Sequence, residues 1–293
     1  MTNSSSPSPS TGRRLLAVFA HPDDETFGTG GTLALYARRG VEVYLICATR
    51  GEVGEAPHDL KGFTSIGDMR EDELRRAASV LGLKAVYFLG YRDSGMPGSP
   101  DNHHPQALAS APLEQVARQV AGYIREIRPQ VVIAFDPIGG YRHPDHIAIH
   151  RASVEAFRMA GDLSQDLDSL PPYSPQKLYY STFSRRLLRA VVRLLPLFGQ
   201  DPHHFGKNKD IDLASLVEVD FPIHASVSIR EVLRLKEQAS ACHASQGGGL
   251  SRPVRWLQHW FGGSEEFMRA IPATPPPHLE RDLFEGVELR EAS

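Results

Sequence analysis

The sequence predicts an α/β protein with a Rossmann-like, mostly parallel sheet that carries helices on both faces. Short apolar runs alternate with amphipathic stretches through the first half of the chain. The runs are apolar at almost every position, which is typical of strands buried on both faces of a parallel sheet. Charged clusters follow two of these runs, at the points where strands of a doubly wound sheet would end. We expect the strand order 3-2-1-4-5 and an irregular C-terminal elaboration.

Each element of the first half is predicted from its own pattern. Apolar runs of about four to eight residues predict strands, and they cover residues 15–20, 41–47, 85–89 and 131–135. The stretches between them place apolar residues at three- and four-residue steps, and they predict helices over residues 29–39, 68–81, 112–128 and 143–159. Gly40 and Gly82 end the first two helices, because glycine readily adopts the left-handed conformation found there.

The second half of the chain is less regular. Residues 178–182 are predicted as a fifth strand, and Ser228 with Glu231 forms a capping-box pattern before a helix that ends near residue 243. Glycines at 247–249 and prolines at 275–277 interrupt regular structure. We therefore expect three parts, which are a polar tail over 1–12, one α/β domain over 13–246 and an extension over 247–293 packed on the same domain.

A basic amphipathic helix is predicted over residues 184–197. Its arginines recur every four residues opposite a leucine-rich face, and they are Arg185, Arg189 and Arg193. Such a helix can lie on an anionic membrane, or it can pack on its own domain or on a second subunit. We favour packing, so no membrane association is expected and a homo-oligomer stays open.

The composition excludes several classes of protein. The chain has 293 residues, of which 41% are hydrophobic and 23% are charged, as in soluble globular proteins. Its net charge of −3 provides no basic field, so no nucleic acid partner is expected. No apolar run approaches the roughly 18 residues of a membrane span, and the polar start does not match a signal peptide. Cys47 and Cys242 form no disulfide framework, and these features together predict a cytoplasmic protein.

Two clusters of histidine and aspartate follow apolar runs. HPDDE at residues 21–25 follows the first strand, and HPDH at residues 143–146 follows the fourth. In the predicted order these two strands are neighbours at the point where the order reverses, which is where such sheets bind ligands. A catalytic zinc ion takes three nitrogen or oxygen ligands and keeps one position open for water. His21, Asp24 and His146 can provide these ligands, so we expect Zn²⁺, with Fe²⁺ as the alternative.

The remaining residues of the clusters fit the steps of a hydrolysis. A bound metal ion can lower the pKa of water from about 15.7 to about 7, and Asp23 can accept the proton as general base. His143 can protonate a leaving amine or stabilise an oxyanion, and Tyr141 can donate a further hydrogen bond. Asp145 can orient His143 or His146. Each motif alone also fits a turn with a helix cap, but their joint position after neighbouring strands favours a metal site.

These segments resemble the PIG-L/LmbE-like family of zinc-dependent N-acetylglucosamine deacetylases. AHPDDE and HPDH are the two hallmark motifs of that family, and the similarity runs from about Leu15 to Gln246. The resemblance implies the same three metal ligands, with Asp23 as general base and His143 as acid or electrostatic stabiliser. It also implies a small-molecule N-acetylglucosaminide as the partner, whose acetamide is hydrolysed to a free amine and acetate.

The resemblance further implies residues that hold the substrate. Arg70 and Asp93 would bind sugar hydroxyls or a neighbouring substituent, and RDSGM at residues 92–96 is similar to enzymes of mycothiol metabolism. Arg142 stands where those relatives typically carry a small residue. It would favour an anionic substituent such as malate, or it would only cap a helix. An amidase acting on a thiol-conjugate amide of the mycothiol type is therefore an alternative to the deacetylase.

Three other classes share part of this pattern. A non-haem iron oxygenase also uses two histidines and one carboxylate, but its sites usually lie in β-rich barrels. A nucleotide-binding module could use the glycines at 28–31, but their spacing differs from G-x-G-x-x-G and HPDDE places anions where a pyrophosphate would sit. We expect these glycines to allow a close approach of backbone and sugar. A non-catalytic sugar-binding relative would have no evident need for Asp23 and His143.

Overall fold

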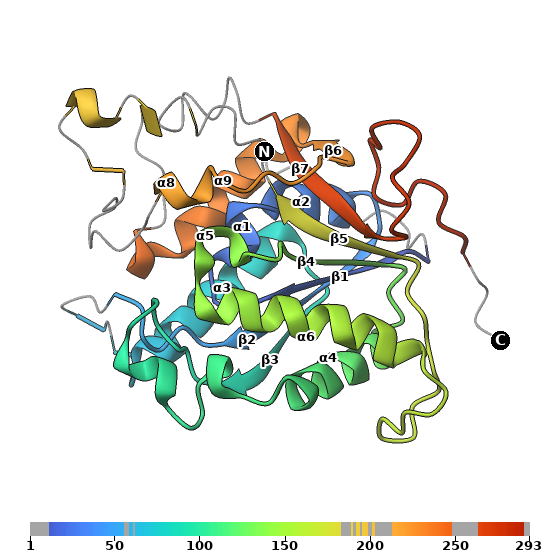
Figure 1. The fold of residues 1–293 in the computed structure, drawn as a ribbon, viewed down its shortest axis with the longest axis horizontal. Coiled ribbons are helices and arrows are strands. Elements are labelled where there is room, and N and C mark those ends of the chain that lie inside the picture. The colour runs from blue at the N-terminus through green and yellow to red at the C-terminus, as the bar shows by residue number, and fades with distance from the viewer. Residues whose placement is uncertain are drawn as a thin grey trace, which may run out of the picture.

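The central feature of the computed structural model is a seven-stranded sheet between two layers of helices (Figure 1). The structure describes residues 12–55, 59–60, 62–182, 189, 192–193, 195–198, 201–202, 213–247 and 263–289. Most of the predicted tail and of the helix predicted over 184–197 lies outside these residues. Among the described residues, no helix combines the length and the apolar character needed to cross a membrane.

The sheet has the strand order β3-β2-β1-β4-β5-β7-β6. The strands are β1 (Arg14–Phe19), β2 (Glu42–Thr49), β3 (Ala85–Tyr91), β4 (Val131–Phe135), β5 (Lys177–Thr182), β6 (Ala225–Ser228) and β7 (Ser264–Ile271). The first five strands run parallel to their neighbours, which confirms the predicted order and the Rossmann-like class. β7 and β6 continue the sheet beyond β5 as antiparallel strands, so part of the C-terminal elaboration is regular.

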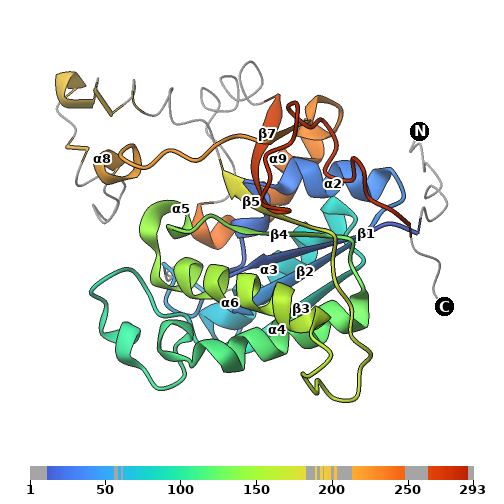
Figure 2. The ribbon, with the colours of Figure 1, turned by 45° about the vertical axis from the view of Figure 1, so that its right-hand side comes forward.

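Helices cover both faces of this sheet. The helices of the described residues are α1 (Asp24–Phe27), α2 (Gly30–Arg38), α3 (Ile66–Leu81), α4 (Leu113–Ile127), α5 (Gly139–Arg142), α6 (Pro144–Gly161), α8 (Leu213–Leu216) and α9 (Leu233–Cys242), with short 3-10 helices η1 (Pro100–His103), η2 (Leu108–Ser110), η3 (Leu195–Phe198), η4 (Arg230–Val232) and η5 (Ala244–Gln246). α4 and α6 lie on one face, and α2, α3 and α9 lie on the other (Figure 1, Figure 2). Alternate residues of β1 face these two layers, with Leu15 and Ala17 on one side and Leu16 and Val18 on the other. Because both faces are buried, the central strands β1 and β4 are apolar at almost every position.

The capping box predicted at Ser228 and Glu231 is wrong. Ser228 is the last residue of β6 and pairs with Ser264 of β7, so its backbone belongs to the sheet and starts no helix. Helix α9 begins only at Leu233, and no side chain caps its first turn. The Glu231 carboxylate instead accepts a hydrogen bond from Arg39 at the surface, at 3.2 Å.

β7 is a strand that the sequence pattern does not predict, because it is not an apolar run. One of its buried residues is Glu265, whose carboxylate accepts hydrogen bonds from the N–H groups of Gly31 at 2.9 Å and Thr32 at 2.7 Å. The Lys236 ammonium lies 2.7 Å from the same carboxylate. A free helix N-terminus attracts anions, but at α2 the protein's own carboxylate occupies it. The nucleotide-binding alternative is therefore wrong.

The glycines before and within α2 allow the chain to pack closely on itself. A Cβ atom on Gly31 would lie 2.6 Å from Ile229 Cδ1, and one on Gly28 would lie 2.7 Å from Ser181 Oγ. Protein atoms fill the space beside these two glycines. The expectation that they make room for a sugar is therefore wrong at Gly28 and Gly31.

Candidate metal centre

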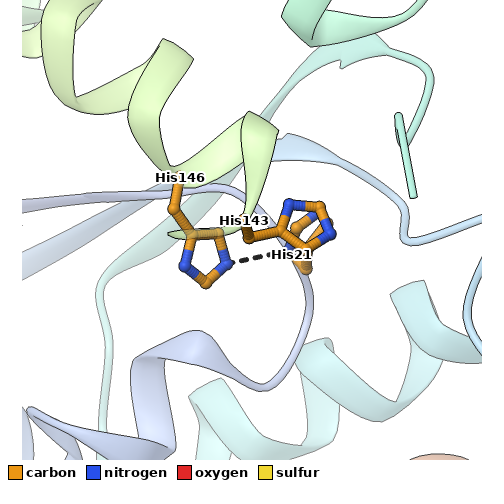
Figure 3. Close-up of side chains that lie close together, drawn as sticks. All are labelled: His21, His143 and His146. Carbon is orange, nitrogen blue, oxygen red and sulfur yellow. Dashed lines mark hydrogen bonds between the residues drawn. The ribbon is translucent and has the colours of Figure 1, made fainter. Parts of the chain in front are cut away.

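The HPDDE and HPDH segments meet at the edge of the sheet where β1 and β4 end. These strands pair in parallel, with Leu15 opposite Val131, and the strand order reverses between them. His21 follows β1, whereas His143 and His146 lie at the start of α6. Figure 3 shows these three imidazoles gathered together, with His21 and His146 directed toward each other. The predicted meeting of the two clusters at the switch point of the sheet is confirmed.

Ligand groups of three residues converge between the two segments. His21 Nδ1 lies 3.2 Å from His146 Nε2 and 3.6 Å from Asp24 Oδ2. His146 Nε2 lies 3.3 Å from Asp24 Oδ1. Ligands placed tetrahedrally at about 2.0–2.1 Å from a zinc ion are separated from one another by about 3.3–3.4 Å. The spacing of these atoms therefore fits one divalent metal ion.

The outer nitrogens of both rings face hydrogen-bond acceptors. His21 Nε2 lies 3.0 Å from Asp145 Oδ2, and His146 Nδ1 lies 3.2 Å from the Gly139 carbonyl oxygen. When each imidazole is neutral and carries its one proton on the outer nitrogen, the inner nitrogen turns a lone pair inward. Two lone pairs and the Asp24 carboxylate thus surround one point, where a cation would satisfy them. Metal-binding histidines generally have this arrangement.

The electrostatics of the cluster also favour a cation. Burial lowers the pKa of His21, but the carboxylates of Asp93, Asp145 and Asp24 raise it well above its usual value. Burial raises the pKa of Asp24, but His146 and His21 hold it well below its usual value. The carboxylates of the cluster therefore stabilise positive charge beside His21.

His143 is a second candidate ligand, because its ring lies near both other histidines. Ring nitrogens of His21, His143 and His146 lie within 4.8 Å of one another. However, His143 Nδ1 accepts a hydrogen bond from the Asp145 N–H at 3.2 Å and so caps α6. This bond places the proton of the neutral ring on Nε2, which makes that nitrogen a donor. Asp24 Oδ2 also accepts a hydrogen bond, from the His21 N–H at 2.7 Å, but Asp24 Oδ1 lies 3.3 Å from His146 Nε2 and a carboxylate keeps further lone pairs for a metal. The assignment of Asp24 as a ligand stays a prediction.

Asp23 occupies a strained turn beside the cluster. Its φ of 116° lies in a region that residues other than glycine rarely adopt, and such strain costs on the order of 1–3 kcal/mol. The Thr26 N–H and hydroxyl both donate to the Asp23 carbonyl oxygen, at 2.9 and 2.8 Å. Burial raises the pKa of Asp23 to about 7, with Arg70 lowering it and Asp24 raising it. The two hydrogen bonds from Thr26 therefore hold the backbone of this turn in place.

The Arg70 side chain, predicted to bind substrate, is bound to the protein itself. Its Nη2 donates to the Pro22 carbonyl oxygen at 2.7 Å and to Asp23 Oδ2 at 3.3 Å, and Nη1 donates to the Gly51 carbonyl oxygen at 2.9 Å. The residue is 4% exposed. Arg70 thus joins the turn of Asp23 to the loop after β2.

Asp93, the second predicted substrate ligand, is also buried. Its Oδ1 accepts a hydrogen bond from the Gly95 N–H at 2.8 Å and lies 3.5 Å from His21 Nε2. Its Oδ2 accepts one from the Val53 N–H at 3.2 Å. Asp93 therefore joins the loops after β2 and β3 next to His21, and its role toward a sugar stays a prediction.

The structure assigns Asp145 a different partner from those predicted. Its carboxylate contacts His21 rather than the two histidines of its own segment, and it also accepts hydrogen bonds from the Ser94 N–H and hydroxyl. The Asp145 carboxylate does not orient His143 or His146, because α6 directs it across the site toward the loop after β1. Asp145 contacts His143 only through its backbone N–H, which donates to His143 Nδ1 at 3.2 Å.

Tyr141 and Arg142 lie at the rim of the site. Tyr141 is 37% exposed as a residue, and its ring lies edge-on to that of His146, with ring centroids 4.9 Å apart. Arg142 is exposed, and its Nη2 donates to the Ser215 carbonyl oxygen at 3.3 Å. These positions suit side chains that contact a bound substrate from outside.

One buried pair has no role in the sequence-based prediction. His243, which follows α9, places Nε2 2.6 Å from Glu25 Oε1. Burial lowers the pKa of His243, but Glu25, Asp23 and Glu73 raise it above its usual value. Glu25 belongs to HPDDE, and His243 begins the segment HASQ at residues 243–246. Neither segment indicates from its sequence that these two residues would pair.

Fold and site together define a class, which is a Rossmann-like α/β protein with a histidine and aspartate site that could bind a metal ion at its switch point. Within that class the chain belongs to the PIG-L family. The family model described as "PIG-L: GlcNAc-PI de-N-acetylase" matches residues 16–157, which include both motifs.

Similar proteins cover nearly the whole chain. A 1D-myo-inositol 2-acetamido-2-deoxy-alpha-D-glucopyranoside deacetylase of Thermobifida fusca (strain YX) is 45% identical, over 93% of this chain and 99% of the relative. A protein of the same name from Thermomonospora curvata is 39% identical, over 80% of this chain and 81% of the relative. The crystal structure of the conserved protein TT1542 from Thermus thermophilus matches with a TM-score of 0.60 and 25% identity, over 90% of this chain and 96% of that one.

Proposed function

We propose that the protein is a metal-dependent N-deacetylase that hydrolyses the acetamide of an N-acetylglucosaminyl compound to a free amine and acetate. The observation that carries this proposal is the convergence of three inward-facing acceptor atoms, from His21, Asp24 and His146, beside Asp23 and His143. The relatives' names support the sugar, and they make 1D-myo-inositol 2-acetamido-2-deoxy-alpha-D-glucopyranoside the first substrate to test.

The metal ion would be held by His21 Nδ1, His146 Nε2 and the Asp24 carboxylate. Zinc suits a tetrahedral set of nitrogen and oxygen ligands, and Fe²⁺ is the alternative because it also binds two histidines and one carboxylate. When bound, such an ion lowers the pKa of water and polarises the amide carbonyl. The outward hydrogen bonds to Asp145 and Gly139 keep both rings in the orientation of ligands.

Asp23 would accept the proton of the attacking water. Arg70 Nη2 lies 3.3 Å from Asp23 Oδ2, which restrains the carboxylate while the other oxygen can face the water. The same proton can then pass from the carboxyl group to the nitrogen of the leaving amine. One residue would thus serve first as general base and then as general acid.

His143 would stabilise the oxyanion as a neutral donor. Because its Nδ1 accepts the Asp145 N–H, its proton resides on Nε2, where it can be donated to a developing negative charge. This geometry favours the role of stabiliser over that of acid. The Tyr141 hydroxyl would provide a second donor from the rim.

The choice of substrate separates the deacetylase from its nearest alternative. An amidase acting on a thiol-conjugate amide would use the same machinery on a different acyl group. Arg142 lies exposed at the rim, where it could contact a substituent of the sugar. A panel of N-acetylglucosaminides with inositol, malate, chitobiose and lipid substituents, together with a cysteine-conjugate amide, would be assayed for acetate and for free amine.

Two variants test the proposed roles. Asp23→Asn should keep stoichiometric metal and lose at least about 10²-fold in rate, since general acid–base groups contribute about 10²–10⁴-fold. His146→Ala should lose the metal. Near-normal turnover by Asp23→Asn would refute its role as base.

The products and requirements of the reaction separate the remaining alternatives. Free amine formed without acetate would indicate the amidase. Turnover that requires oxygen would indicate the oxygenase, and binding of sugar without turnover would indicate a non-catalytic relative.

A further inference from the structure

One buried pair joins the HPDDE segment to the residue that follows helix α9. α1 and α9 pack against each other (Figure 1). His243, directly after α9, pairs with Glu25 of α1, and the two residues are 2% and 1% exposed. The other ring nitrogen of His243, Nδ1, has no hydrogen-bond partner among the described residues. Removing the imidazole would therefore break one side-chain hydrogen bond in this part of the structure.

Glu25 connects this pair to Asp23. While Oε1 faces His243, the other oxygen, Oε2, accepts a hydrogen bond from the Asp23 N–H at 3.0 Å. Asp23 has a φ of 116°, and a backbone conformation of this kind persists only when surrounding contacts enforce it. The direction of the Asp23 side chain follows from that conformation. Its orientation thus depends on a histidine that is 218 positions from Glu25 in the sequence.

We propose that His243 is a positioning residue for the general base. Through Glu25 it fixes the strained backbone of Asp23 and so directs the Asp23 carboxylate toward the reacting water. This inference rests on the proposed function, because it presupposes that Asp23 is the base. His243 itself touches neither the metal nor the substrate in this scheme.

The segment after α9 also provides a matched control. The Ser245 N–H and hydroxyl donate to the Glu73 carboxylate of α3, at 2.8 and 2.6 Å. These bonds anchor the same segment to α3 and do not involve Glu25. Ser245→Ala therefore tests whether loosening the segment is by itself enough to alter the rate.

The first experiment compares His243→Leu with His243→Gln. Leucine removes the donor, whereas the glutamine amide can place an N–H near the position of Nε2. A misplacement of about 1 Å can cost about 10²-fold in rate, so we expect His243→Leu to lose about 10- to 100-fold in kcat. KM should stay within about threefold and the metal should stay stoichiometric. His243→Gln should recover most of the rate, and Ser245→Ala should match the wild type. An unchanged kcat in His243→Leu would overturn the proposal.

A double-mutant cycle with Asp23→Asn separates positioning from a general structural role. If His243 acts through Asp23, then adding His243→Leu to Asp23→Asn should change kcat by less than about twofold. An equal loss in both backgrounds would overturn the proposal and leave the deacetylase function intact. If His243→Leu does not fold, His243→Asn replaces it, since its shorter amide does not reach Glu25. Equal kcat values for His243→Asn and His243→Gln would likewise overturn the proposal, whereas a wild-type rate in Asp23→Asn would overturn the base itself.

Discussion

Asp145 is the residue at which the effect of charge on the metal site can be isolated. Its Oδ2 accepts hydrogen bonds from His21 Nε2 at 3.0 Å and from the Ser94 N–H at 2.9 Å, and Oδ1 accepts one from the Ser94 hydroxyl. In Asp145→Asn, the amide oxygen can keep the position of Oδ2. The amide nitrogen can take the position of Oδ1, where the hydroxyl can accept instead of donate. The variant therefore keeps the shape and these hydrogen bonds while it removes the negative charge, and the Ser94 hydroxyl hydrogen loses its carboxylate acceptor.

The expected effect follows from the strength of that hydrogen bond. A hydrogen bond to a charged group contributes about 1.5–3 kcal/mol, whereas a neutral one contributes about 0.5–1.5 kcal/mol. The bond to His21 should therefore weaken by about 1–1.5 kcal/mol, which corresponds to about 5- to 13-fold in an equilibrium constant. Loss of a partner that orients a metal-binding histidine typically costs about 10- to 100-fold in metal affinity or activity. We expect Asp145→Asn to bind zinc about tenfold more weakly.

Competition with a chelator of known zinc affinity, at neutral pH, measures this change directly. Ser94→Ala is the control, because it removes one donor to Asp145 and leaves the charge. Thermal unfolding of the metal-free proteins checks that both variants keep the fold. Zinc affinity within about twofold of the wild type for Asp145→Asn would refute the reasoning that this charge supports His21 as a ligand.

Three further predictions concern packing and charge. A Cβ on Gly139 would lie 2.7 Å from His146 Cβ, whereas one on Gly140, at a similar φ of 65°, meets nothing within 4 Å. Gly139→Ala should therefore lose more than about tenfold in zinc affinity, and Gly140→Ala should lose much less. Equal losses in the two variants would contradict the clash with His146. Arg125 donates to four backbone carbonyls at 2.8–3.0 Å. At about 1 kcal/mol per bond, Arg125→Leu should lower the free energy of unfolding, measured in urea, by about 3–4 kcal/mol. A loss below about 1 kcal/mol would contradict this prediction. Burial raises the pKa of Glu280, but hydrogen bonds from Lys177 and Tyr179 hold it below its usual 4.5. The ionised Glu280 carboxylate therefore stabilises the folded protein above about pH 4.5, and this stabilisation is lost as the pH falls through the lower pKa of the folded state. Glu280→Gln should therefore cost about 1.5–3 kcal/mol at neutral pH, and a difference from the wild type that stayed constant down to pH 3 would refute this.

Local patterns in the sequence were enough to predict the five parallel strands and their order. The inner strands of this parallel part are buried on both faces and β3 is partly buried, so the apolar runs stand out against the turns around them. The same patterns place HPDDE after β1 and HPDH after β4, and the switch-point rule then brings His21 near His146. β7 could not be predicted in this way, because its buried Glu265 interrupts the apolar pattern.

The pairing of buried charges was decided only by the tertiary structure. The clusters already contained Glu25 and Asp145, but their partners are His243, from the far end of α9, and His21, from the other cluster. Arg70 likewise turned out to bind the turn of Asp23. The physical reason is that sequence periodicity reports which faces are buried, and it carries no information on how far and at what angle two helices pack. That packing determines which donor reaches which carboxylate.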